Sequence, residues 1–145
     1  MEHASMVHAL REIHRTLKPN GILLDMRPIE ENWAVEVKSD ARVDVAGRLV
    51  HIPSGLADTA ACFEALRDVE ARGWFVQERA EKFTFFYYWD MPSEMKAYIE
   101  TEWDSYEKLE EEVYQRASSL WASANAEARV RVHRKMWLAR WRKTN

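Results

Sequence analysis

Residues 9–28, ALREIHRTLKPNGILLDMRP, decide the expected fold, because they predict a helix, a tight turn and a strand in direct succession. The helix is indicated by an apolar stripe at helical spacing, formed by Met6, Leu10, Ile13 and Leu17. Pro19, Asn20 and Gly21 end this helix. Ile22–Leu24 is an apolar run of strand length, typical of a parallel strand covered on both faces, although so short a run is also compatible with a buried helix. The stretch therefore predicts an α/β protein.

The next segment is expected to form a loop followed by a hairpin. Residues 27–32 combine a proline with a polar cluster, which favours a loop. Alternating apolar residues then run from Trp33 to Ile52 and predict a small antiparallel meander or hairpin. After a break at residues 53–55, Asp58 is expected to cap a helix that ends at Gly73. Its apolar side carries Phe63, Leu66 and Val69.

The second half of the chain predicts a long strand, two helices and a final segment of ambiguous pattern. Residues 74–89 are rich in aromatic and β-branched side chains and are expected to form the strand. Pro92 lies near the start of one helix, and Ser105 is expected to cap a longer one. Its early glutamates form a solvated face: Glu107, Glu110, Glu111 and Glu112. Residues 129–143 fit either a strand or one face of a helix by pattern alone.

Composition limits the class of protein. The 145 residues suit a single domain spanning 1–145, and 47% hydrophobic content with seven Trp excludes a disordered chain. A net charge of −3 argues against a nucleic-acid partner. Cys62 is the only cysteine, which favours a reducing, cytoplasmic location, and no segment predicts a signal peptide or a membrane span. The five histidines form no metal-binding pattern, and Cys62 is expected to be inert.

The turn Leu17-Lys18-Pro19-Asn20-Gly21 resembles that of class I S-adenosylmethionine (SAM)-dependent methyltransferases, in which a helix ending in Leu-Lys-Pro-Gly-Gly leads into the fifth strand. Asn20 stands where the family has its first glycine. The resemblance aligns residues 9–25 with that helix and strand, Phe75–Trp89 with the sixth strand and residues 129–142 with an antiparallel seventh strand. It thus implies a strand for 129–143 and a partial Rossmann-like fold: a mixed sheet of about five strands, about four helices and a helical insertion at about 92–126.

The resemblance also implies what this chain lacks. The family's glycine-rich cofactor loop follows the first strand, and a ribose-binding acidic residue follows the second. Neither is expected here, because the four glycines are scattered over turns and helix ends. The chain alone is therefore expected to bind no SAM, and SAM would be its cofactor only if the missing half were supplied. Whether it is an enzyme stays open, and no catalytic residue is assigned.

The candidate substrate-binding residues are Asp25, Arg27, Tyr88 and Trp89, because ligands of open α/β sheets bind at the carboxyl ends of parallel strands. Arg27 is suited to an acidic substrate group, and Tyr88 with Trp89 offers a flat apolar wall. The competing interpretation is an ion pair between Asp25 and Arg27 and an aromatic core.

Three hypotheses on function follow from the sequence. The first is a methyltransferase-like chain without independent cofactor binding. The second is a non-catalytic interaction module, in which the apolar edge at residues 21–26 is covered in a homodimer or by a chain that supplies the missing half. The third is a small-molecule-binding module that keeps the substrate side of the fold.

Overall fold

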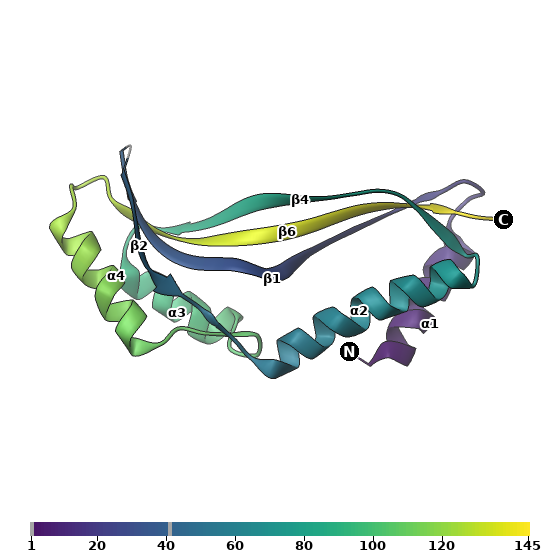
Figure 1. The fold of residues 1–145 in the computed structure, drawn as a ribbon, viewed down its shortest axis with the longest axis horizontal. Helices are drawn as coiled ribbons and strands as arrows, with labels where there is room; N and C mark the ends of the chain where they lie inside the picture. The colour runs from purple at the N-terminus through teal and green to yellow at the C-terminus, as the bar shows by residue number, and fades with distance from the viewer. Residues whose placement is uncertain (1, 41) are drawn as a thin grey trace. The chain divides into compact units, whose positions relative to one another are not determined.

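The computed structural model describes residues 2–40 and 42–145, the side chain of residue 32 aside. These residues form four helices and six strands (Figure 1). In chain order they are α1 (His3–Thr16), β1 (Ile22–Ser39), β2 (Arg42–Arg48), β3 (Val50–His51), α2 (Pro53–Ala71), β4 (Phe75–Trp89), α3 (Pro92–Glu102), β5 (Glu107–Lys108), α4 (Glu111–Ser123) and β6 (Arg129–Lys143). The α/β class is confirmed.

The strands form a four-stranded sheet in the order β2-β1-β6-β4 and a two-stranded sheet of β3 and β5. β1 and β2 are antiparallel, with Ser39 opposite Arg42 and a bulge between Val35 and Glu36. β6 also runs against β1, and the backbone N–H of Lys143 donates to the carbonyl oxygen of Gly21 over 2.9 Å. The sheet is therefore largely antiparallel, and the expected parallel neighbours of Ile22–Leu24 are absent among the described residues.

The chain divides into two compact units, each built from separate segments. Unit 1 consists of residues 1–29, 56–83 and 136–145. Unit 2 consists of residues 30–55 and 84–135.

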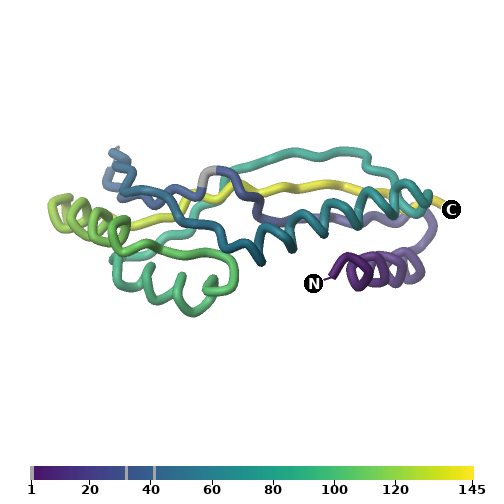
Figure 2. Tube along the Cα trace, turned by 60° about the horizontal axis from the view of Figure 1, so that its bottom comes forward, coloured from purple at the N-terminus to yellow at the C-terminus, as the bar shows by residue number. Residues whose placement is uncertain are grey.

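In unit 1, α1 and α2 lie on the same side of the sheet (Figures 1 and 2). The core beneath these helices consists of Leu66, Val69, Phe75, Ala139 and Trp141. Leu23 of β1 packs against this core, whereas Ile22, Leu24 and Met26, which alternate with it along the strand, are 42%, 65% and 62% exposed. One face of β1 is thus uncovered within unit 1, contrary to the expectation of burial on both faces.

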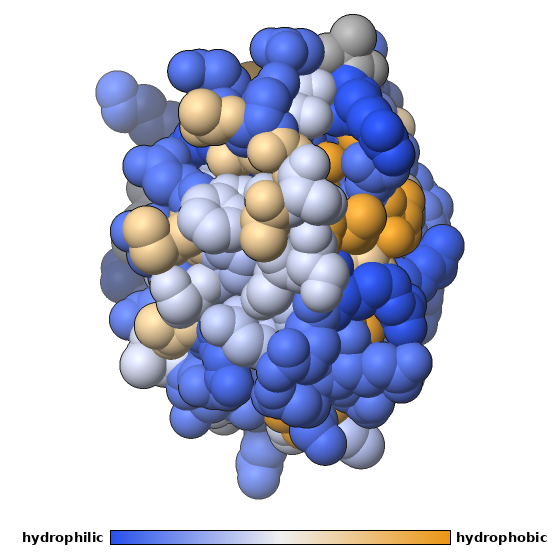
Figure 3. Space-filling model, turned by 90° about the vertical axis from the view of Figure 1, so that its left-hand side faces the viewer, coloured by the Kyte–Doolittle hydropathy of each residue, from blue (hydrophilic) through white to orange (hydrophobic). Residues whose placement is uncertain are grey.

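In unit 2, α4 packs against β2 and α3. Its core is rich in valine and large apolar side chains, namely Trp33, Val35, Val37, Leu49, Met95, Ile99, Trp103, Val130 and Val132. Figure 3 views the molecule from the side where Figure 1 draws α3, α4 and β2, and its surface is mostly hydrophilic, with strongly hydrophobic side chains gathered mainly along one margin.

Several expected boundaries were wrong. The expected loop at residues 27–32 is part of β1; Pro28 is tolerated because proline removes no needed hydrogen bond when its position faces a sheet edge. α2 begins at Pro53, so Asp58 lies inside the helix. Ser105 caps no helix, since α4 begins at Glu111. The hairpin at 33–48, the end of α2 before Gly73 (φ 73°) and the strand at 129–143 are confirmed.

Candidate functional site

The site is a cavity of about 290 Å³ in unit 1, which we call the β1 pocket. Its walls come from three elements: Met6, Leu10 and Ile13 of α1, the stretch 23–27 of β1, and Cys62, Ala65 and Leu66 of α2. The helix residues recur at spacings of three or four, so each helix presents one apolar stripe to the cavity. The pocket is therefore apolar on most of its surface.

Asp25 and Arg27 are the two charged residues of the pocket wall. They lie two positions apart on β1, on the same face as Leu23, which directs both side chains toward the helices. The Arg27 side chain is 16% exposed and that of Asp25 is 12% exposed. The guanidinium also lies over the ring of Phe63, 4.9 Å from its centroid. The ion pair that the sequence left open thus forms, in mid-strand and largely buried.

The ion pair uses only one oxygen of the carboxylate. Arg27 Nε and Nη2 both donate to Asp25 Oδ1, over 3.0 and 2.5 Å. Asp25 Oδ2 and Arg27 Nη1 are buried and have no hydrogen-bond partner among the described residues. Each such group costs roughly 1–3 kcal/mol of folding free energy. Two residues of the pocket wall therefore carry one unpaired acceptor and one unpaired donor, both buried.

Tyr88 and Trp89 lie in unit 2, whereas Asp25 and Arg27 lie in unit 1. The structure therefore does not gather the four candidate residues within one unit. Tyr88 accepts a hydrogen bond from Arg131 Nη1 over 3.0 Å. Trp89 packs against the unit 2 core and stacks on Tyr87, with ring centroids 6.1 Å apart. Trp89 fits the aromatic-core interpretation of the sequence.

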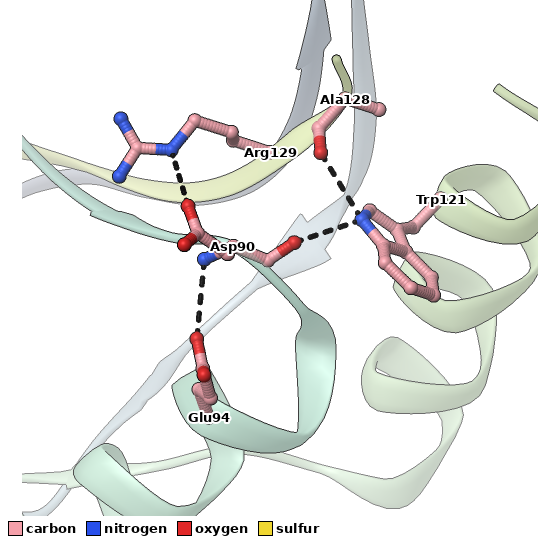
Figure 4. Close-up of polar contacts among 5 residues, drawn as sticks. All are labelled: Asp90, Glu94, Trp121, Ala128 and Arg129. Carbon is pink, nitrogen blue, oxygen red and sulfur yellow. Dashed lines mark hydrogen bonds and ion pairs between the residues drawn. The ribbon is translucent and has the colours of Figure 1, made fainter. Parts of the chain in front are cut away.

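Asp90, which follows Trp89, joins three elements of unit 2 (Figure 4). Arg129 Nε donates to its carboxylate over 3.0 Å, and its backbone N–H donates to Glu94 over 3.3 Å. Trp121 Nε1 of α4 donates to the carbonyl oxygens of Asp90 and Ala128, over 3.0 and 3.2 Å. These contacts fasten the end of β4 to α3, α4 and β6, which is a structural role.

A buried arginine in unit 2 was missed by the sequence analysis. Arg134 is 9% exposed, and its guanidinium carbon lies 4.2 Å from the ring centroid of Trp33 and 4.8 Å from that of Trp103. Burial lowers the pKa of Arg134. The signal was its parity, since Arg134 alternates in step with the buried Val130 and Val132 along β6.

Glu107 was expected on a solvated face, and this was wrong: it is 7% exposed and belongs to β5. Its carboxylate lies 2.7 Å from His51 Nδ1. Burial raises the pKa of Glu107 above its ordinary value of 4.5, although His51 and Arg134 act in the opposite direction. The short β3–β5 pairing places this carboxylate inside unit 2.

A second buried carboxylate lies on β1 in unit 2. Glu36 is 6% exposed and accepts a hydrogen bond from Arg131 Nε over 2.5 Å. His133 Nδ1 lies 3.5 Å from the other oxygen of Glu36, and the Arg131 guanidinium covers the ring of Phe86 at 4.0 Å. The four side chains form one cluster in which Arg131 is paired with Glu36.

Three of the four glycines are closely surrounded by the chain's own atoms. A Cβ at Gly21, Gly47 or Gly55 would meet the chain itself, at 2.8 Å from Lys18 O, 2.7 Å from Val113 and 3.2 Å from Tyr106 respectively. The space beside these glycines is thus filled by the chain's own atoms instead of facing a cavity. Gly73 has a positive φ and ends a helix.

The described residues contain no group of three or more His, Cys, Asp or Glu side chains placed to hold a metal ion. Within the same residues, no helix has the length and apolar character needed to span a membrane.

Comparisons with protein-family models, with curated proteins and with solved structures find no match to this chain.

Proposed function

We propose that this chain is a small-molecule-binding module of methyltransferase-like origin, and that the β1 pocket is its binding site. The observation that carries the proposal is that two residues lining an apolar cavity hold a buried unpaired acceptor and a buried unpaired donor, Asp25 Oδ2 and Arg27 Nη1. Small-molecule sites typically combine apolar walls with a few polar groups that fix orientation. No catalytic residue is assigned.

The methyltransferase-like origin is supported by the order of elements in unit 1. α1 leads through a turn with Asn20 at φ 63° into β1, as the resemblance implies. The last strand, β6, is antiparallel to β1, as the seventh strand of that family would be. The filled space beside the glycines supports the proposal that this chain alone binds no SAM.

Calorimetric titration with SAM tests the cofactor half of the proposal. We expect no binding heat from the isolated chain. Micromolar binding would overturn this half. If a separate chain supplies a cofactor half, SAM binding will appear only in the mixture of the two.

Titration with toluene, followed by NMR chemical shifts, tests the pocket half. We expect saturable shifts in α1 and α2. Ala9→Phe at the pocket wall should weaken toluene binding by steric exclusion. Ala4→Phe, an equally exposed substitution on α1 outside the pocket wall, is the matched control and should leave binding unchanged. Equal loss of toluene binding in both variants, or absence of binding by toluene and by the amide probe benzamide alike, would contradict the pocket as a binding site.

A second candidate function is self-association through the edge of β1, and we propose it on a separate observation. β2 pairs with β1 only over Ala34–Ser39, so Ile22–Arg27 has no strand neighbour on that side among the described residues. The uncovered side chains Ile22, Leu24 and Met26 lie along this edge. An apolar strand edge is a template for pairing with a second chain.

Light scattering over a micromolar concentration range tests this candidate. We expect a dimer that Leu24→Lys shifts toward monomer, because the charge would lie at the paired edge. Leu56→Lys, at an apolar position on α2 that is 39% exposed, is the control and should leave the dimer intact. A monomer at all concentrations would exclude the homodimer.

A further inference from the structure

We infer that the β1 pocket takes a compact, neutral molecule that carries a hydrogen-bond donor and an acceptor on neighbouring atoms of an otherwise apolar body, as in a primary carboxamide. This inference rests on the proposed function, since it specifies the ligand class of the same pocket. The supporting observation is that the Asp25–Arg27 ion pair leaves one oxygen and one nitrogen atom without a hydrogen-bond partner among the described residues.

The hydrogen bonds of the pair determine what the ligand must offer. Asp25 Oδ1 accepts from both Arg27 Nε and Nη2, so the pair is closed on one side. The unused atoms are Asp25 Oδ2, which requires a donor, and Arg27 Nη1, which requires an acceptor. Both residues line the pocket, and both unused atoms are buried, so a ligand would meet them only after a side-chain rotation.

The charge of the pair favours a neutral ligand. Asp25 and Arg27 already neutralise each other, with an N–O distance of 2.5 Å. A carboxylate ligand would accept a hydrogen bond from Arg27 Nη1 but would be repelled by the Asp25 carboxylate. An ammonium ligand would donate to Asp25 but would be repelled by the Arg27 guanidinium. Either ion would also lose its hydration against apolar walls, which is unfavourable without a full counter-charge.

The amide group meets both requirements at once. Its carbonyl oxygen accepts and its NH₂ group donates, and the two lie on one carbon atom, close enough to serve two atoms of a single ion pair. The remainder of the ligand faces the side chains of Met6, Leu10, Ile13, Ala65 and Leu66, which offer only apolar contacts. A flat or compact hydrocarbon body therefore completes the ligand.

Four probes of similar shape separate these requirements: benzamide carries donor and acceptor, benzoate an anionic acceptor, benzylamine a cationic donor, and toluene neither. We expect benzamide to bind at least about tenfold more tightly than toluene, since hydrogen bonds to charged groups are stronger than neutral ones. Benzoate and benzylamine should bind more weakly than toluene. Calorimetry and NMR titration of the full chain provide the affinities.

The double variant Asp25→Leu/Arg27→Met is the matched control, because it replaces the pair by apolar side chains of similar size. It should keep toluene binding and lose the preference for benzamide. Equal binding of toluene and benzamide to the unmodified chain would overturn the ligand class alone. Absence of binding by toluene and benzamide alike would overturn the proposed function as well.

Cys62 gives an independent readout of where the probes bind. It lines the pocket and is the chain's only cysteine. Saturating benzamide should slow alkylation of the Cys62 thiol in the unmodified chain and should lose this effect, at the same concentration, in the double variant. Benzamide binding without protection of Cys62 would overturn the assignment to this pocket.

Discussion

Asp25 and Arg27 form an unusual pair, because a largely buried ion pair normally uses all of its hydrogen-bonding atoms. Here one oxygen and one nitrogen remain unsatisfied. Apolar side chains of similar volume often stabilise a fold as well as a buried ion pair does. The pair therefore contributes little net stability, and the proposed ligand recognition would account for its two unsatisfied atoms.

The first prediction concerns the stability of variants at this pair. Asp25→Leu or Arg27→Met alone should lower the free energy of unfolding by about 3–5 kcal/mol, since each leaves an unpaired buried charge. The double variant should lie within about 1 kcal/mol of the unmodified chain or above it. Urea denaturation at constant pH measures all three. If the double variant loses the sum of the two single effects, the pair is a stabilising element instead.

The second prediction concerns Glu107. Burial raises its folded-state pKa above 4.5, so the fold favours the neutral acid. This contribution to stability is present below the ordinary pKa and is lost as the pH rises through the raised one. Glu107→Gln should therefore gain in stability relative to the unmodified chain between about pH 4 and pH 7, because glutamine stays neutral.

Urea denaturation at a series of pH values measures this difference. Glu110→Gln, at an exposed position, is the control and should show a nearly constant difference. A difference for Glu107→Gln that is flat from pH 4 to 7, or that falls with rising pH, would contradict the raised pKa.

At the scale of helices and strands, the sequence predicted correctly several boundaries that neighbouring residues determine. The stop before β1 depends on the turn at residues 19–21, and the end of α2 depends on Gly73, whose backbone has φ 73°. β6 was ambiguous by pattern, and its alternation of buried and half-buried residues confirms the strand. These features are predictable because residues close in the sequence, or a strong periodic pattern, determine them.

The errors arose where distant residues determine the structure. Pro28 was expected to break β1, but a strand edge tolerates it, and sequence alone does not reveal which edge is free. The expected solvated helix around Glu107 is instead a short strand, because Val50 and His51 pair with it. The Asp25–Arg27 pair was foreseen as an alternative, whereas its pocket depends on α2, which is distant in the sequence.

The third prediction tests the end of α2. Gly73→Ala should lower the free energy of unfolding by about 1 kcal/mol, because its φ of 73° is unfavourable for a residue with a Cβ atom. No atom lies within 4 Å of an added Cβ, so the loss would be conformational and not steric. Gly73→Asn, which tolerates this conformation better, should lose less. Thermal unfolding compares the two variants, and equal losses would point to another cause.

At the scale of the whole molecule, the chain carries two hydrophobic cores, one in each unit. β1, β4 and β6 contribute residues to both units. Each unit has its own pair of helices, α1 with α2 and α3 with α4. The two cores can therefore unfold with different free energies of unfolding.

The fourth prediction is that the cores respond separately to substitution. Leu66→Ala in unit 1 and Met95→Ala in unit 2 should each cost about 2–5 kcal/mol in the affected core. Native-state hydrogen exchange should show faster exchange in α1 and α2 for Leu66→Ala, and in α3 and α4 for Met95→Ala. Equal acceleration in all four helices would show a single cooperative unit.

The walls of the β1 pocket come from the first helix, the first strand and α2. α1 begins at His3 and has no side-chain cap at its start, and its one buried residue is Met6 of the pocket wall. A molecule in the pocket would touch all three elements and clamp α1 onto the sheet. Occupancy would then slow the cleavage of α1 by trypsin, which cuts after Arg11 and Arg15, so limited digestion would report the presence of a ligand.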